Sequence, residues 1–113
     1  MSVNYYAFGP GITDPEGLHI GQYAVSSRFL MQSLPELGLT SLAAWMDFLR
    51  RPGVIIRAEH GLEASPDEME ETIRERVDSR GWSKQARIRR PYDARPGYHV
   101  DAEGVEFCEL DFC

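Results

Sequence analysis

The chain has 113 residues, 42% hydrophobic and 27% charged, and its 18 acidic and 12 basic side chains leave a net charge of −6. These values exclude collagen, coiled coil and wholesale disorder, and the length predicts a single domain over residues 1–113. An acidic domain of this size is a poor general binder of nucleic acid, because phosphate contacts need clustered cations.

The first half of the chain predicts three strands followed by a helix. Residues 3–8 are rich in aromatic, β-favouring side chains, and residues 18–23 and 27–33 alternate between two faces. We therefore expect these segments to form an antiparallel meander. Residues 40–51 change to a helical period, with a Thr or Ser cap and a Pro-Gly stop. The apolar stripe of this helix consists of Leu42, Trp45, Met46 and Leu49.

The second half predicts a buried strand, a second helix and a hairpin. Residues 54–56 are β-branched, and residues 65–68 combine an N-cap, a proline at the first helical position and a capping-box glutamate. Residues 98–100 and 105–112 read as strands around the turn 101–104. The stripe of the second helix is Met69, Ile73 and Val77. The sequence thus predicts an α+β fold, with an antiparallel sheet of about five to six strands packed against two helices.

The charge is unevenly distributed along the chain. Residues 80–95 hold six bases and one acid, a local charge of +5, so the remaining residues carry −11 to reach the total of −6. The acidic residues predicted to contact a partner lie in and before the second helix and in the C-terminal hairpin: Glu63, Asp67, Glu68, Glu70, Glu71, Asp101, Glu103, Glu106, Glu109 and Asp111. In the second helix the acidic residues come first and the arginines late, an order that the helix dipole favours. Helix stability is therefore an alternative explanation for the acidic residues of this helix.

No motif in the sequence indicates catalysis. The Gly9-Pro10-Gly11 stretch lacks the later residues of a P-loop or dinucleotide fingerprint, and neither Ser26, Ser27 nor Cys108 stands in a nucleophile motif. We therefore expect no enzymatic activity and no cofactor. Cys108 and Cys113 are expected to be thiols, with a terminal disulfide as the alternative.

Metal binding is not predicted, although a few candidate ligands lie near one another. His99 and Asp101 alternate onto one face of a strand, and Glu59 and His60 precede Glu63. Two ligands on one strand do not make a site. Among the three histidines, His19 is the candidate for a pocket, because glycines on either side allow another backbone to come close.

The basic segment leaves several interpretations open. Its arginines and aromatic side chains suit phosphate contact with base stacking, a protein interface, or a solvated loop that pairs with the chain's own acids. Direct nucleic-acid binding is disfavoured by the −11 elsewhere in the chain. The residues of an alternative pocket or basic contact are His19, Arg87, Arg89, Arg90 and Tyr92.

Short islands across most of the chain resemble a group of small phage- and prophage-encoded proteins of unassigned function. The islands are residues 17–21 (Gly-Leu-His-Ile-Gly), 45–54, 59–61 and 100–108. The resemblance implies a small phage gene product that acts in the host bacterial cytoplasm. A cytoplasmic location also agrees with the absence of a ~20-residue apolar run and of a signal peptide.

In that setting we expect a non-enzymatic inhibitor of a bacterial defence complex, of the anti-CRISPR kind. Acidic patches would occupy the basic surface of a nucleic-acid-handling host protein, since opposed fields speed association and select the partner. One alternative is an immunity-type protein, or a modulator of a host enzyme, that uses the same kind of contact. The other is a domain that sequesters a small molecule or nucleotide through His19 and the arginines.

Overall fold

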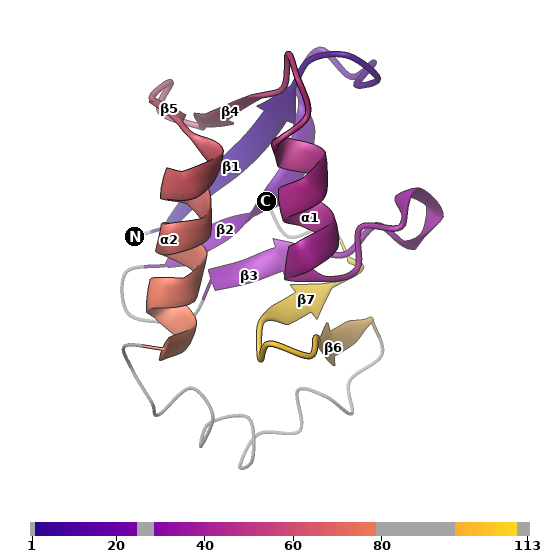
Figure 1. Ribbon diagram of the computed structural model, residues 1–113, viewed down its shortest axis with the longest axis vertical. Helices are drawn as coiled ribbons and strands as arrows, with labels where there is room; N and C mark the ends of the chain where they lie inside the picture. The colour runs from indigo at the N-terminus through magenta and orange to yellow at the C-terminus, as the bar shows by residue number, and fades with distance from the viewer. Residues whose placement is uncertain (1, 25–28, 79–96, 111–113) are drawn as a thin grey trace.

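The structure, a computed structural model, describes residues 2–24, 29–78 and 97–110. These residues form an α+β fold in which two α-helices accompany a mixed sheet of seven strands (Figure 1). The strands are β1 (Ser2–Phe8), β2 (Leu18–Ala24), β3 (Phe29–Gln32), β4 (Ile55–Ala58), β5 (Glu63–Ala64), β6 (Tyr98–Val100) and β7 (Glu106–Cys108). The helices are α1 (Leu42–Leu49), α2 (Pro66–Asp78) and the short 3₁₀ helix η1 (Pro35–Leu37).

The sheet has the order β5-β4-β1-β2-β3-β7-β6. The expected antiparallel meander of β1, β2 and β3 is confirmed, and β4 adds to the outer side of β1. The expectation of a wholly antiparallel sheet is wrong, because β7 runs parallel to β3. Alternation along a strand indicates which side chains share a face, but it carries no information on the direction of a neighbour 76 residues away, such as Cys108 beside Gln32.

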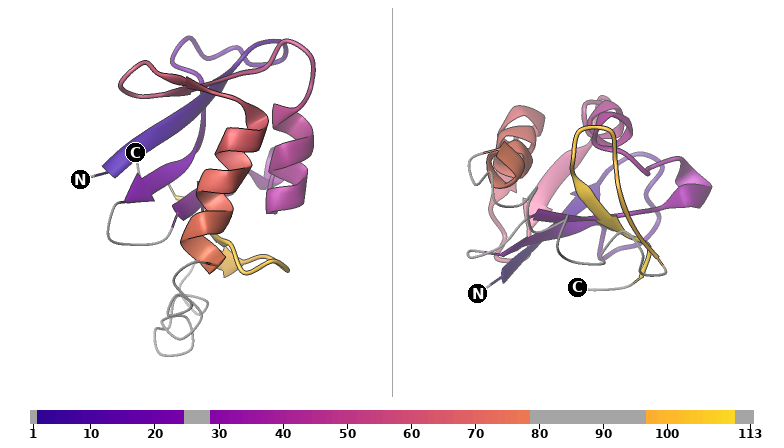
Figure 2. Two further views of the ribbon diagram at one scale, coloured as in Figure 1. Left: turned by 60° about the vertical axis from the view of Figure 1, so that its left-hand side comes forward. Right: turned by 90° about the horizontal axis from the view of Figure 1, so that it is seen from below.

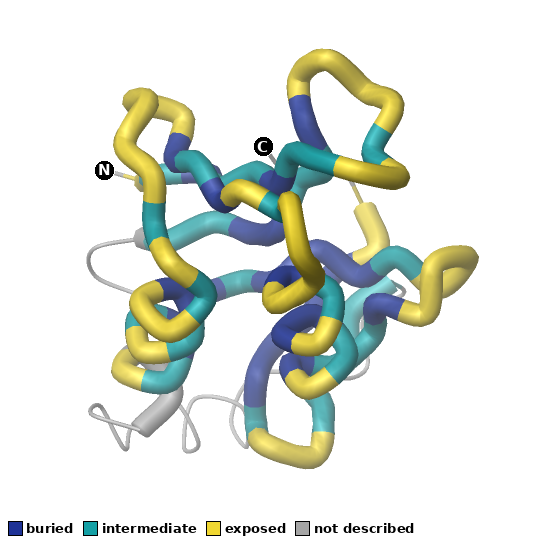
Figure 3. The backbone as a smooth tube through the Cα atoms, turned by 45° about the horizontal axis from the view of Figure 1, so that its top comes forward, coloured by how far each residue is buried: buried dark blue, intermediate teal, exposed yellow. Residues whose placement is uncertain are grey.

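Both α-helices lie on the same face of the sheet (Figure 2). The core between these layers contains the aromatic side chains of Trp45, Phe29 and Phe107, all of which have no exposed surface. The predicted stripe of α1 is buried throughout, and Met69 and Ile73 of α2 are buried as well. The side chain of Val77 lies outside the described residues. Burial falls off sharply at the connecting loops (Figure 3).

The N-termini of both helices are capped by side chains. In α2 the Ser65 hydroxyl accepts from Glu68 N while the Glu68 carboxylate accepts from Ser65 N, which confirms the capping box. In α1, Ser41 accepts from Ala44 N, and Leu42 N donates to the carboxylate of Asp101 at 2.8 Å. The second cap comes from 59 residues along the chain, so the β6–β7 turn is fastened to the start of α1.

Several strand boundaries differ from the sequence prediction. The strand expected at residues 54–56 is Ile55–Ala58, and the last strand is shorter, Glu106–Cys108. The two-residue strand β5 was not predicted, because pairing of Glu63 with Arg57 rather than local pattern defines it. Within the described parts of the chain, no helix is long and apolar enough to cross a membrane.

Candidate functional site

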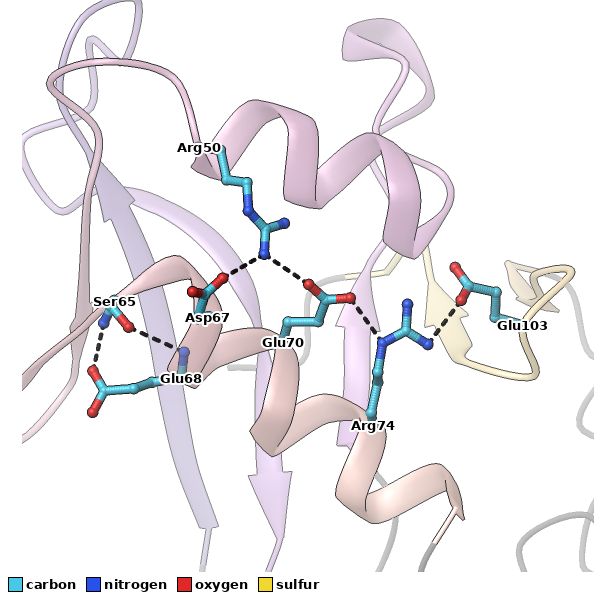
Figure 4. A network of polar contacts seen from close by, with 7 residues as sticks. All are labelled: Arg50, Ser65, Asp67, Glu68, Glu70, Arg74 and Glu103. Carbon is cyan, nitrogen blue, oxygen red and sulfur yellow. Dashed lines mark hydrogen bonds and ion pairs between the residues drawn. The ribbon is translucent and has the colours of Figure 1, made fainter.

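Five charged side chains join α1, α2 and the β6–β7 turn into one network (Figure 4). Arg50, just after α1, contacts both Asp67 and Glu70 of α2 at 2.8 Å. Glu70 also accepts from Arg74 Nε at 2.8 Å, and Arg74 reaches Glu103 in the turn at 2.8 Å. Acids and bases therefore alternate, and the network of three acids and two arginines has a net charge of only −1.

The network shifts the ionisation of its members in the direction that preserves it. Hydrogen bonds from Arg50 and then Arg74 lower the pKa of Glu70 below its ordinary value. The bonds to Glu70 in turn raise the pKa values of Arg50 and Arg74. Glu70 is thus ionised as part of the fold, and most of its charge is balanced internally.

Six of the ten acidic residues predicted for partner contact have structural roles, among them Glu68 in the capping box of α2. Asp67, Glu70 and Glu103 belong to the network, and Glu63 pairs with Arg57 at 3.0 Å. Asp101 caps α1 and also accepts from Glu103 N and Val105 N within its own turn. Glu106 is only 4% exposed, so it does not lie on the surface. Asp111 is outside the described residues.

Three exposed acids of α2 lie on its outer side. Met69 and Ile73 face the core, whereas Glu70 and Arg74 face α1 and the turn. Glu68, Glu71 and Glu75, spaced at i, i+3 and i+7, share the remaining side, and all three are exposed. We call these three residues the α2 acidic ridge. Glu75 was missed from the sequence, although its spacing from Glu68 and Glu71 on one helical face would have included it.

His19 lies on the sheet face opposite the helices and joins three strands. Its Nδ1 is 2.8 Å from Gln32 Oε1, and its Nε2 is 2.9 Å from Asn4 Oδ1. The side-chain amides of Gln32 and Asn4 are oriented by the hydrogen bonds of their NH₂ groups. Gln32 Nε2 donates to the carbonyls of Cys108 and Leu110, and Asn4 Nδ2 donates to Glu59 Oε1. Each ring nitrogen of His19 therefore faces an amide oxygen, which is a hydrogen-bond acceptor.

The glycines beside His19 have the effect expected from the sequence. A Cβ at Gly21 would lie 2.5 Å from Leu30 O, so only glycine allows β2 and β3 to pair at this point. Gly17 has a φ of +88°, and a Cβ there would lie 2.7 Å from the Phe8 ring. The two glycines thus allow close packing of β2 against β3 and of the residue before β2 against Phe8.

A cavity of about 310 Å³ adjoins His19. Its described polar lining consists of Tyr6, Asp14, Glu16, His19, Gln32 and Glu109. The predicted partners of His19 in a pocket, Arg87, Arg89, Arg90 and Tyr92, lie outside the described residues. Three carboxylates without any described lysine or arginine in the lining disfavour a phosphate-bearing ligand here.

The other candidate ligands of the sequence have ordinary contacts. His99 is 3.0 Å from Thr40 O and stacks on Phe107 with ring centroids 5.1 Å apart. His60 Nδ1 accepts from Leu62 N, and Cys108 is a buried free cysteine. Residues 2–24, 29–78 and 97–110 contain no group of three or more side chains suited to hold a metal ion.

Comparison of the chain with known protein families, with curated proteins and with solved structures gives no match. The resemblance to small phage-encoded proteins stays a prediction.

Proposed function

We propose that this protein is a non-enzymatic inhibitor that binds a basic surface of a nucleic-acid-handling protein through the α2 acidic ridge. The setting we propose is that of a phage protein acting on a bacterial defence complex of the CRISPR kind. The observation that carries the proposal is the exposure of Glu68, Glu71 and Glu75 along one side of α2. Asp67 and Glu70 of the same helix contact arginines, and the three residues of the ridge are exposed on its outer side.

The spacing of the ridge supports imitation of a nucleic-acid strand. Seven helical residues span roughly 10 Å at ~1.5 Å per residue. One strand of duplex DNA carries one charge per ~3.4 Å of axis, or about three charges over the same length. The ridge, with three carboxylates, matches that density. A cationic groove that accepts a phosphate backbone would therefore accept this side of α2 in its place.

The rigidity of the helix also supports the proposal. The capping box fixes the start of α2, Met69 and Ile73 anchor it in the core, and Arg50 and Arg74 hold its inner side. A preorganised ridge loses little conformational entropy on binding. Other acidic residues predicted from the sequence, such as Glu109, are also exposed. We propose them as further contact residues outside the α2 acidic ridge.

A phage plaque assay in bacteria with active CRISPR systems of the different types tests this function. We expect the wild-type protein to restore plaque formation of a targeted phage in at least one system. The double variant Glu71→Lys with Glu75→Lys should lose this protection, because it reverses the ridge without touching the network. The matched control, Glu36→Lys with Asp47→Lys, makes the same charge change at exposed positions elsewhere and should protect like wild type.

Two outcomes would contradict the proposal. Wild-type protein that restores no plaques in any system would remove the defence-inhibitor function. Equal protection by both double variants would show that the ridge is not the contact surface.

A further inference from the structure

A second cavity lies away from the α2 acidic ridge, between the β1–β2 loop, η1 and the end of α1. It has a volume of about 410 Å³, near the lower end of the ~300–1,000 Å³ typical of small-molecule sites. Its apolar lining includes Ile12, Leu18, Leu37, Leu39 and Phe48. Leu37 is 58% exposed although it is a large apolar side chain, so the cleft presents apolar surface to solvent.

Arg51 lines the same cleft and differs from the other arginines whose side chains are described. Arg50, Arg57 and Arg74 each contact a carboxylate within 3.0 Å. The described residues give Arg51 no such partner, and its guanidinium lies 5.2 Å from the centroid of the Phe48 ring. Asp14, which also lines the cleft, instead accepts from Glu16 N at 2.9 Å. An exposed arginine without an anion thus stands beside an apolar cavity.

We propose that this cleft binds a small organic acid, an apolar body that carries one carboxylate. The apolar part would cover Ile12, Leu37 and Phe48, and the carboxylate would pair with Arg51. A guanidinium suits this role because it is weakly hydrated and offers paired donors to a carboxylate. The site is independent of the proposed function, since none of its residues belongs to the α2 acidic ridge.

Titration with octanoate and with octanol, followed by the amide and methyl resonances of the full chain, tests the site. The two probes share an alkyl chain and differ in charge. We expect octanoate to shift the resonances of Ile12, Leu37 and Phe48. In Arg51→Gln the Kd for octanoate should rise about three- to fivefold, as for a partly exposed ion pair, while the Kd for octanol stays within about twofold.

Arg57→Gln is the matched control for the charge. Arg57 also lies over an aromatic ring, 5.1 Å from the centroid of Phe8, but it pairs with Glu63 and does not line the cleft. This variant should bind octanoate like wild type. Equal weakening in the two arginine variants, or equal loss of both probes in Arg51→Gln, would overturn the role of Arg51.

The apolar wall is tested with Leu37→Asp against Leu62→Asp. Both leucines are largely exposed, at 58% and 70%, so both variants should fold, but only Leu37 lines the cleft. Leu37→Asp should abolish the shifts from both probes, and Leu62→Asp should leave them unchanged. Absence of any shift at the cleft in the wild-type protein, up to millimolar probe, would overturn the proposal.

Discussion

At the scale of single residues, the side-chain amides of Gln32 and Asn4 bear on the charge of the His19 ring. The NH₂ groups of Gln32 and Asn4 point away from the ring, toward two backbone carbonyls and Glu59. Carboxylates surround the site as well, with Glu59 behind Asn4 and Asp14, Glu16 and Glu109 along the adjacent cavity. Both features favour a positively charged imidazole.

We therefore predict that His19 carries protons on both ring nitrogens at neutral pH. Nitrogen-15 NMR of the side chains measures this directly, since a protonated and an unprotonated ring nitrogen differ widely in chemical shift. His60, which is exposed and accepts from Leu62 N through Nδ1, provides the internal reference. An unprotonated nitrogen on His19 at neutral pH would contradict the arrangement of Asn4 and Gln32.

Glu70 is the residue through which the helices are coupled electrostatically. Its carboxylate receives hydrogen bonds from Arg50 and Arg74, which lower its pKa. A carboxylate with a lowered pKa in the folded state stabilises the fold above its unfolded pKa, and this contribution is lost as pH falls through the folded value. The stability that Glu70 provides is thus present at neutral pH and absent in acid.

Glu70→Gln should lower the free energy of unfolding by about 0.5–1 kcal/mol at neutral pH, the range for a partly exposed pair in a network. The difference from wild type should shrink below the ordinary glutamate pKa of 4.5 and vanish in stronger acid. Urea unfolding at several pH values measures it. Glu71→Gln, on the exposed side of the same helix, should stay within about 0.5 kcal/mol of wild type. A constant deficit across the pH range would refute the electrostatic explanation.

At the scale of elements, the sequence was most informative where the signal is local. The capping box of Ser65 and Glu68 and the apolar stripe of α1 depend on residues within two turns, and both are present as predicted. The strands β1 and β2 are likewise present where the sequence predicted them. The sequence pattern did not indicate the parallel pairing of β7 with β3 or the two-residue strand β5. Both are defined by the strand that pairs with them and not by their own local pattern.

The same limit applies to the candidate site. The acidic composition of α2 was evident, but the sequence could not separate Glu70, which two arginines neutralise, from Glu71, which points outward. Asp101 was predicted as a partner contact, yet its position beside Leu42 N makes it a helix cap. The cleft at Arg51 escaped notice, because its walls come from three separate segments.

At the scale of the whole molecule, several of the acidic side chains behind the net charge of −6 are paired with arginines within the fold. The inner side of α2 is nearly neutral, its outer side carries the α2 acidic ridge, and the organic-acid cleft lies elsewhere. This division separates the charges that hold the elements together from those proposed to meet a partner. It also predicts that variants of Glu71 and Glu75 change association while leaving the network and the fold intact.

The most direct test is the affinity for a purified CRISPR effector that the protein inhibits, measured by titration calorimetry at low and high salt. We predict binding that weakens at least tenfold as salt screens the contact. Glu71→Lys with Glu75→Lys should abolish it, whereas Glu36→Lys with Asp47→Lys should bind as wild type does. Affinity that is insensitive to salt, or equal for the two double variants, would contradict the acidic-ridge account.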